Sequence, residues 1–229
     1  MPKVREGYLE EKRKEILKAA FKVCMRKPAY ELTMSDIVAE TGMSQGGVYK
    51  YFDNIISVYA ALIDEANQRG DRKERIDEIN ASDLRPEVKL RELFSIAESF
   101  LSDMLISYNK ILFELDTLYL QDPKLGKKIY ARTTTTPVFQ HLAGSVSGLI
   151  TAGVSDGCFK PVVPVQDILA FIVSSFDGII RDVTLSKCYN ESSDHVSAFD
   201  EKKLIDCLYL STMTLLGKSP THSKRKEKP

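Results

Sequence analysis

Residues 32–52 read LTMSDIVAETGMSQGGVYKYF, a segment that contains two helix starts. Thr33 is followed three residues later by Asp36, which is close to a capping box and predicts a helix beginning there. Gly42 ends this helix after barely two turns, and Ser44 is a new N-cap for a helix over residues 45–52. Two short helices joined by a glycine-containing turn are typical of a helix-turn-helix, whose second helix enters the DNA major groove.

The stretch before this pair predicts a third helix. Apolar residues at 16, 17, 20, 21 and 24 recur at helical spacing within a charged sequence, and Pro28 ends the helix because the residue before a proline avoids the α region. We therefore expect a three-helix DNA-binding domain over residues 1–54.

The second helix of the pair is predicted to present small and polar residues outward. Val48 and Phe52 are four apart and face inward, while Gly46 and Gly47 each cost about 1 kcal/mol relative to alanine in a helix. Close approach of the backbone to DNA offsets this cost; the alternative is that the glycines only lengthen a turn. The outward side chains suit base edges and phosphates, and the hydroxyls at the two helix starts suit phosphate oxygens. The predicted DNA-binding residues are Thr33, Ser44, Gln45, Gly46, Gly47, Tyr49, Lys50 and Tyr51.

These residues resemble the TetR family of bacterial transcriptional regulators, without a gap from Leu32 to Phe52. The resemblance implies a homodimer that binds a palindromic double-stranded DNA operator and is released by a small-molecule effector. It also implies that Thr33, Ser44 and Tyr51 contact the DNA backbone, that Gln45, Gly46 and Lys50 lie near bases, and that Tyr49 contacts a phosphate. The family commonly has a lysine two or three residues after the Tyr-Phe pair, where this chain has Asp53-Asn54-Ile55-Ile56.

The remaining sequence predicts further helices, because its apolar residues repeat at three and four and show no strand-like alternation. The fold class is therefore all-α, with about nine helices in total: the helix-turn-helix domain, then a larger helical effector-binding and dimerisation domain over residues 55–217. Four threonines and a proline at 133–137 predict a kink or break. Residues 218–229 form a basic tail that we expect to be disordered.

The segment 165–185 is apolar almost all round, which predicts burial on two sides and hence a dimer interface. By the family resemblance, it would form a four-helix bundle with residues 204–216 across a two-fold axis. The predicted interface residues are Ile172, Phe176, Ile179, Ile180, Val183, Leu208 and Leu215.

An effector cavity is expected among the helices between residues 55 and 155. Its candidate residues are aromatic, Met or polar side chains on or beside the apolar stripes, any of which can equally be ordinary core or rim. Asp116 at the edge of an apolar stripe would favour a cationic ligand. The candidates are Phe94, Phe100, Met104, Tyr108, Phe113, Asp116, Tyr119, Phe139 and His141.

Composition narrows the function classes. The 229 residues carry no net charge, but residues 1–52 hold ten Lys/Arg against seven Asp/Glu, a balance of +3 that suits a polyanionic partner. The four scattered cysteines and the charged N-terminus predict a reduced, cytoplasmic protein with no membrane span, metal or cofactor. The chain carries no recognisable catalytic motif, so we do not expect an enzyme. The alternative is a helical ligand-binding or interaction module that no longer binds DNA specifically.

Overall fold

The computed structural model describes residues 7–69, 72–104, 108–189 and 200–218. These residues are all-helical, as predicted, and contain eleven α-helices and one 3-10 helix rather than about nine helices. One extra helix is α5 (Lys73–Ala81), in a charged segment where the sequence predicted no helix. The other arises because the predicted break is confirmed: α8 (Pro123–Tyr130) and α9 (Val138–Ser155) are separate helices. The expected tail beyond Lys218 lies outside the described residues.

The chain divides into two compact units. The first joins residues up to 70 with residues 104–136, and the second joins residues 71–103 with those from 137 onward. The chain therefore crosses from one unit to the other three times. The division of function at residue 54 stays a prediction, because compactness does not report on what each segment binds.

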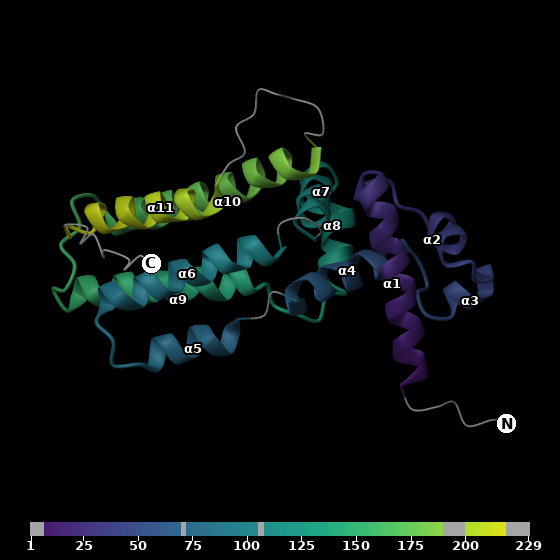
Figure 1. Cartoon of the computed structure of the whole chain (residues 1–229), viewed down its shortest axis with the longest axis horizontal. Coiled ribbons are helices and arrows are strands. Elements are labelled where there is room, and N and C mark those ends of the chain that lie inside the picture. The colour runs from purple at the N-terminus through teal and green to yellow at the C-terminus, as the bar shows by residue number, and fades with distance from the viewer. Residues whose placement is uncertain (1–6, 70–71, 105–107, 190–199, 219–229) are drawn as a thin grey trace, which may run out of the picture. The chain divides into compact units, whose positions relative to one another are not determined.

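The first unit contains the predicted three-helix arrangement (Figure 1). Its helices are α1 (Tyr8–Arg26), η1 (Ala29–Glu31), α2 (Met34–Thr41), α3 (Gln45–Tyr49), α4 (Ile55–Arg69), α7 (Tyr108–Gln121) and α8. Ile16, Ile37, Val48 and Phe52 are almost completely buried in one core, and each such side chain contributes about 1.5–3 kcal/mol. Ile111 of α7 belongs to the same core, so α7 packs with the helix-turn-helix.

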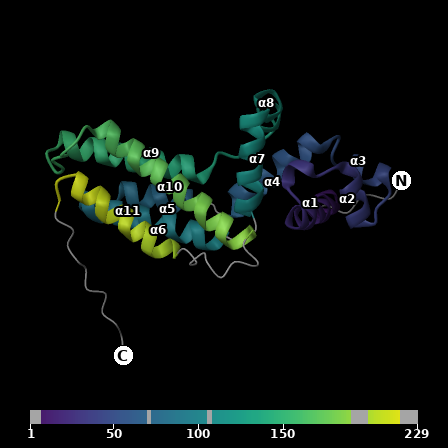
Figure 2. The same cartoon turned by 90° about the horizontal axis from the view of Figure 1, so that it is seen from above.

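The second unit contains α5, α6 (Pro86–Met104), α9, α10 (Val165–Tyr189) and α11 (Glu201–Leu215). Figure 2 shows α10 and α11 running alongside each other, in agreement with their close packing, and α9 contacts both α5 and α10. Within the described part of the chain, no helix is both long enough and apolar enough to cross a membrane.

Candidate nucleic-acid interface

The turn between α2 and α3 follows the sequence pattern closely. Thr33 caps α2 in a reciprocal capping box with Asp36, and Gly42 ends the helix in the left-handed region at φ 64°. Ser44 caps α3 by accepting a 3.1 Å hydrogen bond from the Gly47 N–H. The third helix is shorter than expected: it ends at Tyr49, and a turn carries the chain to Phe52.

The outward face of α3 carries the predicted side chains. Gln45, Tyr49 and Lys50 are exposed, whereas Val48 lies fully in the core. Tyr51 is half-buried, and its carbonyl oxygen accepts a 3.3 Å hydrogen bond from Arg13 of α1. Arg13 also lies 4.3 Å from the centre of the Phe52 ring, so α1 holds in place the end of residues 45–52, which we call the recognition segment.

The two glycines of α3 differ in their surroundings. A Cβ at Gly46 would meet nothing within 4 Å, whereas a Cβ at Gly47 would lie 3.2 Å from Ser44 Oγ and 3.4 Å from Met43 Cε. Gly47 therefore has a packing reason inside the protein. No packing contact within 4 Å requires a glycine at position 46.

The two N-cap hydroxyls also differ in what they can offer a phosphate. Thr33 donates both its hydroxyl, at 2.6 Å, and its backbone N–H, at 2.8 Å, to Asp36 Oδ2. The Ser44 oxygen instead accepts from Gly47, so its own proton can be donated to a phosphate oxygen. Of the two, Ser44 is the better placed phosphate donor.

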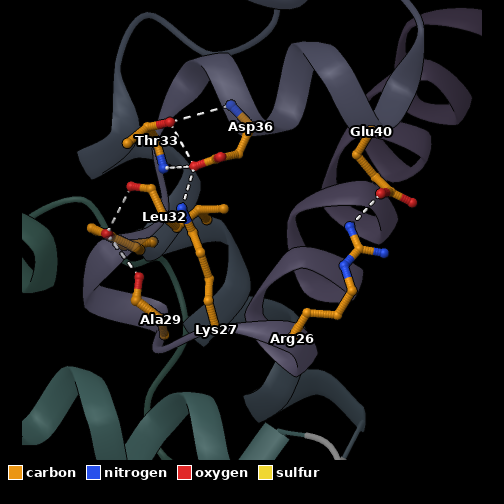
Figure 3. Close-up of polar contacts among 8 residues, drawn as sticks. Arg26, Lys27, Ala29, Leu32, Thr33, Asp36 and Glu40 are labelled. Atoms are coloured by element: carbon orange, nitrogen blue, oxygen red, sulfur yellow. Dashed lines mark hydrogen bonds and ion pairs between the residues drawn. The ribbon is translucent and has the colours of Figure 1, made fainter.

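Ion pairs fix α2 against α1 and the following turn (Figure 3). Lys27 Nζ lies 2.6 Å from Asp36 Oδ2, and the Lys27 and Thr33 hydrogen bonds together lower the pKa of Asp36 from 3.8 to about 2. Glu40 accepts from Arg26 and lies 3.7 Å from Lys22, and these partners hold the pKa of its carboxyl below its usual value. The position of α2, and hence of the turn to α3, is set by these contacts as well as by the core.

The segment after Phe52 pairs with a distant part of the chain. Asp53, in the region where the resemblance leads one to expect a lysine, accepts from Arg132 at 2.9 and 3.1 Å. This pairing holds the pKa of the Asp53 carboxyl below its usual range. At the start of α4, Asn54 Oδ1 accepts from the Ser57 N–H at 3.1 Å and the Ser57 hydroxyl donates to the Asn54 carbonyl at 2.6 Å, so Asn54 caps this helix.

A second contact joins α4 to the same distant segment. Both oxygens of Asp64 accept hydrogen bonds from the backbone N–H groups and hydroxyls of Thr134 and Thr135, at 2.7–3.0 Å. Asn67 donates to the Thr135 hydroxyl at 2.9 Å. We call residues 132–135 the strap. It lies along α4 within the first unit and leads directly into α9 of the second.

The second unit contains an apolar cavity of about 380 Å³ among α6, α9, α10 and α11. Of the predicted effector residues, the structure brings Phe94 and Phe139 together in its wall. The sequence did not single out most of the other lining residues, since the aliphatic side chains of α9 and α10 carry no signal that separates a cavity wall from solid core. They include Leu93, Leu142, Ala143, Val146, Ser147 and Leu169.

The other predicted effector residues do not line this cavity. Tyr108, Phe113, Asp116 and Tyr119 belong to α7 in the first unit, where the helix packs against the helix-turn-helix core. The Tyr108 ring lies 4.8 Å from the Phe21 ring at a tilt of 39°, and Asp116 accepts from Tyr130. The remaining three have separate surroundings. Phe100 is half-buried on α6, the side chain of Met104 lies outside the described residues, and His141 Nε2 lies 2.8 Å from Asp77 Oδ1.

The predicted dimer residues divide into two groups. Ile172, Phe176, Val183 and Leu208 are buried within the single chain, which favours a core role. Ile179, Ile180 and Leu215 are half-buried. A groove between α10 and α11 exposes apolar side chains that the sequence analysis did not select, because a helix that is apolar all round gives no hint of which side its own chain covers. They include Val163, Phe171 and Leu210.

Among the described residues, no group of three or more His, Cys, Asp or Glu side chains could hold a metal ion. Cys24, Cys158 and Cys207 are free thiols, and Cys24 is completely buried.

The sequence and the fold of this chain are similar to those of known transcriptional regulators. Residues 16–62 match the family of bacterial regulatory proteins, tetR family. YfiR of Bacillus subtilis (strain 168), an uncharacterized HTH-type transcriptional regulator, is 27% identical over 215 residues, covering 93% of this chain and 96% of YfiR. The MbdR regulator from Azoarcus sp. CIB shares the fold, with a TM-score of 0.62, 18% identity and coverage of 90% of this chain and 98% of MbdR. A TetR transcription regulator from Haloarcula marismortui ATCC 43049 has a TM-score of 0.60, with 16% identity and coverage of 91% and 97%.

Proposed function

Because the chain belongs to the TetR family of helix-turn-helix transcriptional regulators, we propose that it is a repressor that binds a palindromic DNA operator as a homodimer. In this proposal a small molecule enters the apolar cavity of the second unit and releases the protein from the operator. The role is regulatory and not enzymatic.

The observation that carries the DNA-binding proposal is the outward face of α3. Gly46 is open to solvent for no internal reason, and Gln45, Tyr49 and Lys50 are exposed beside it. Gln45 can make a bidentate contact with an adenine edge, and Lys50 can contact a phosphate or a guanine. Tyr49, Tyr51, Ser44 and the start of α2 at Thr33 supply contacts to the DNA backbone.

The dimer proposal rests on the groove between α10 and α11. Its exposed apolar side chains, Phe171 and Val163, lie next to the half-buried Leu210 and Leu215. A second copy of the chain, related by a two-fold axis, would cover the same groove on both subunits. Two α3 helices held in this way would read half-sites separated by about one helical turn of DNA or a multiple.

The strap gives a route from the cavity to the DNA. Its residues are held by Asp53 and Asp64 at two places on and beside α4, and the chain continues within a few residues to Phe139 in the cavity wall. A ligand that shifts the beginning of α9 therefore pulls on the helix that directly follows the recognition segment. Such coupling needs the ligand to bind one arrangement of the strap better than the other.

The test is fluorescence anisotropy against the DNA that flanks the protein's own gene, repeated over a salt series. We expect tight, specific binding, and the logarithm of the association constant should fall linearly with the logarithm of the salt concentration. Sedimentation of the protein should show a dimer. Gln45→Ala should lose discrimination between specific and random DNA, while Lys50→Ala weakens binding to both or alters base preference. Equal loss on both DNAs for Gln45→Ala would refute its assigned role.

One observation favours the alternative, a helical ligand-binding module without specific DNA binding. Asp53, which pairs with Arg132, lies in the stretch after Phe52 where the family resemblance leads one to expect a lysine that meets a phosphate. If the protein is a monomer that binds no operator-like duplex, with or without ligand, this alternative is supported and the proposed repressor function is wrong.

A further inference from the structure

The walls of the cavity in the second unit are almost entirely hydrocarbon. Leu93, Phe94, Leu142, Val146 and Ile172 supply aliphatic and aromatic surface from three helices, and Phe139 stacks on Phe176 at 4.8 Å with the rings nearly parallel. None of the lining residues is charged. The one polar side chain among them is the hydroxyl of Ser147 on α9.

Several ionisable residues that neighbour the wall in sequence pair with other side chains of the protein, among them the acids Glu92 and Glu98, which pair with Arg75 and Lys202. Arg91, three residues before Phe94, lies 2.6 Å from Asp206 Oδ1 and 4.8 Å from the centre of the Tyr209 ring. His141, next to Leu142, bonds to Asp77. Since these groups are engaged elsewhere, an ionised ligand entering the cavity would have to leave water without a protein counter-charge. The free-energy cost of removing an ion from water is much larger than the cost for a neutral molecule.

We infer that the cavity takes an uncharged, mainly hydrocarbon molecule with at most one hydrogen-bonding group, which Ser147 would meet. Medium-chain alcohols have this chemistry, and carboxylates or amines of the same length do not. The effector role of the ligand rests on the proposed function, whereas the ligand class rests on the cavity alone.

The test compares three molecules of equal chain length on the full-length protein at neutral pH: octan-1-ol, octanoate and octylammonium. Each competes with a neutral fluorescent probe, N-phenyl-1-naphthylamine. We expect octan-1-ol to bind at least about tenfold more tightly than either ion, because tenfold corresponds to only a small part of the cost of burying an unpaired charge. Equal or tighter binding of octanoate or octylammonium overturns the inference.

Two variants locate the binding. Ala143→Phe puts a ring into the cavity and should abolish displacement by octan-1-ol, whereas Gly144→Ala, at the next residue of α9, has no atom within 4 Å of its new Cβ and should change nothing. Ser147→Ala should weaken octan-1-ol severalfold while leaving octane unaffected. Unaltered binding of octan-1-ol to a folded Ala143→Phe protein would contradict the site.

Operator binding is measured on the same samples, so that the two proposals can fail separately. If octan-1-ol enters the cavity without changing operator affinity, the ligand class stands and the proposed release by effector fails. If no neutral molecule binds while the operator is still bound, the ligand class fails and the DNA-binding role stands.

Discussion

Asp64 of α4 accepts both the backbone N–H and the hydroxyl of Thr134, at 2.9 and 2.8 Å. One carboxylate therefore fixes the segment that leaves α8 and enters α9. Because its Oδ1 also accepts the backbone N–H and the hydroxyl of Thr135, the contact behaves as a clamp and not as a single surface hydrogen bond.

Removing this clamp should weaken the effect of ligand binding on the affinity for DNA. In Asp64→Asn one of the two acceptor oxygens is replaced by an NH₂ donor, which costs about 1–3 kcal/mol of stability. We expect ligand-free operator affinity to change little and the effect of octan-1-ol on that affinity to shrink severalfold, measured by anisotropy. Asp156→Asn makes the same chemical change at an exposed residue after α9 and should leave both quantities as they are. A full ligand response in Asp64→Asn would show that the strap is not the route.

The two α3 glycines should respond in opposite ways to alanine. Gly46→Ala places its Cβ in open space and should raise stability by about 0.5–1 kcal/mol, because alanine is the better helix former. The same Cβ should weaken operator binding by blocking close approach of the backbone. Gly47→Ala crowds Ser44 and should lower stability. Urea denaturation and anisotropy on the two variants separate the effects, and tight operator binding by Gly46→Ala would remove the reason given for that glycine.

The recognition segment could be predicted from local sequence because its signals are local. Thr33, Asp36, Gly42 and Ser44 act on residues within four positions, so capping rules identify the helix ends directly. The exposure of Gln45 and Lys50 follows from the burial of Val48. Only the end of α3 differed, and helix ends are the least determined feature of such a pattern.

The effector and dimer residues could not be predicted in the same way, because an apolar stripe does not say which partner covers it. The stripe of α7 fills the helix-turn-helix core through Ile111 and Leu115, although it looked equally suited to a ligand cavity. Likewise Phe176 of α10 packs on Phe139 within one chain, while Phe171 of the same helix is exposed. Long-range pairs such as Asp64 with Thr134 leave no trace in sequence spacing.

The cap of α2 should make stability depend on acid pH. The pKa of Asp36 is about 2 when folded against 3.8 as its ordinary value, so its contribution is complete above about pH 5 and is lost as the pH falls toward 2. Since the side chain is about one-third exposed, solvent screening reduces the effect to about 1 kcal/mol. We would measure the free energy of unfolding by urea denaturation from pH 6 to pH 2. Its decrease over this range should be about 1 kcal/mol smaller in Asp36→Asn than in the parent protein. Parallel curves would rule out this contribution.

Cys24 should be inert in the folded protein. It is completely buried, and burial raises the pKa of its thiol to about 12, so almost no thiolate exists at neutral pH. Iodoacetamide followed by peptide mass spectrometry should label the exposed Cys207 in the folded state and Cys24 only after unfolding in guanidinium chloride. Labelling of Cys24 at the rate of Cys207 without denaturant would mean that the core between α1 and α7 opens readily.

The buried residues Lys110 and Glu114 should contribute to the free energy of unfolding mainly through their interaction with each other. Lys110 Nζ donates to Glu114 at 2.8 Å and to the Cys24 carbonyl at 2.8 Å, and Glu114 accepts from the Ala29 N–H at 2.6 Å, so α7 holds the end of α1 and the start of η1. Lys110→Met leaves a buried carboxylate without its cation and should cost about 3–5 kcal/mol.

Adding Glu114→Gln to that variant should recover more than half of the loss. The glutamine carbonyl can still accept from Ala29, and no unpaired charge remains. Glu114→Gln alone completes a double-mutant cycle by urea denaturation, in which the two changes should be strongly non-additive. If the losses simply add, the ammonium and carboxylate are stabilised independently by the backbone groups around them, and the pair is not what joins α7 to the helix-turn-helix.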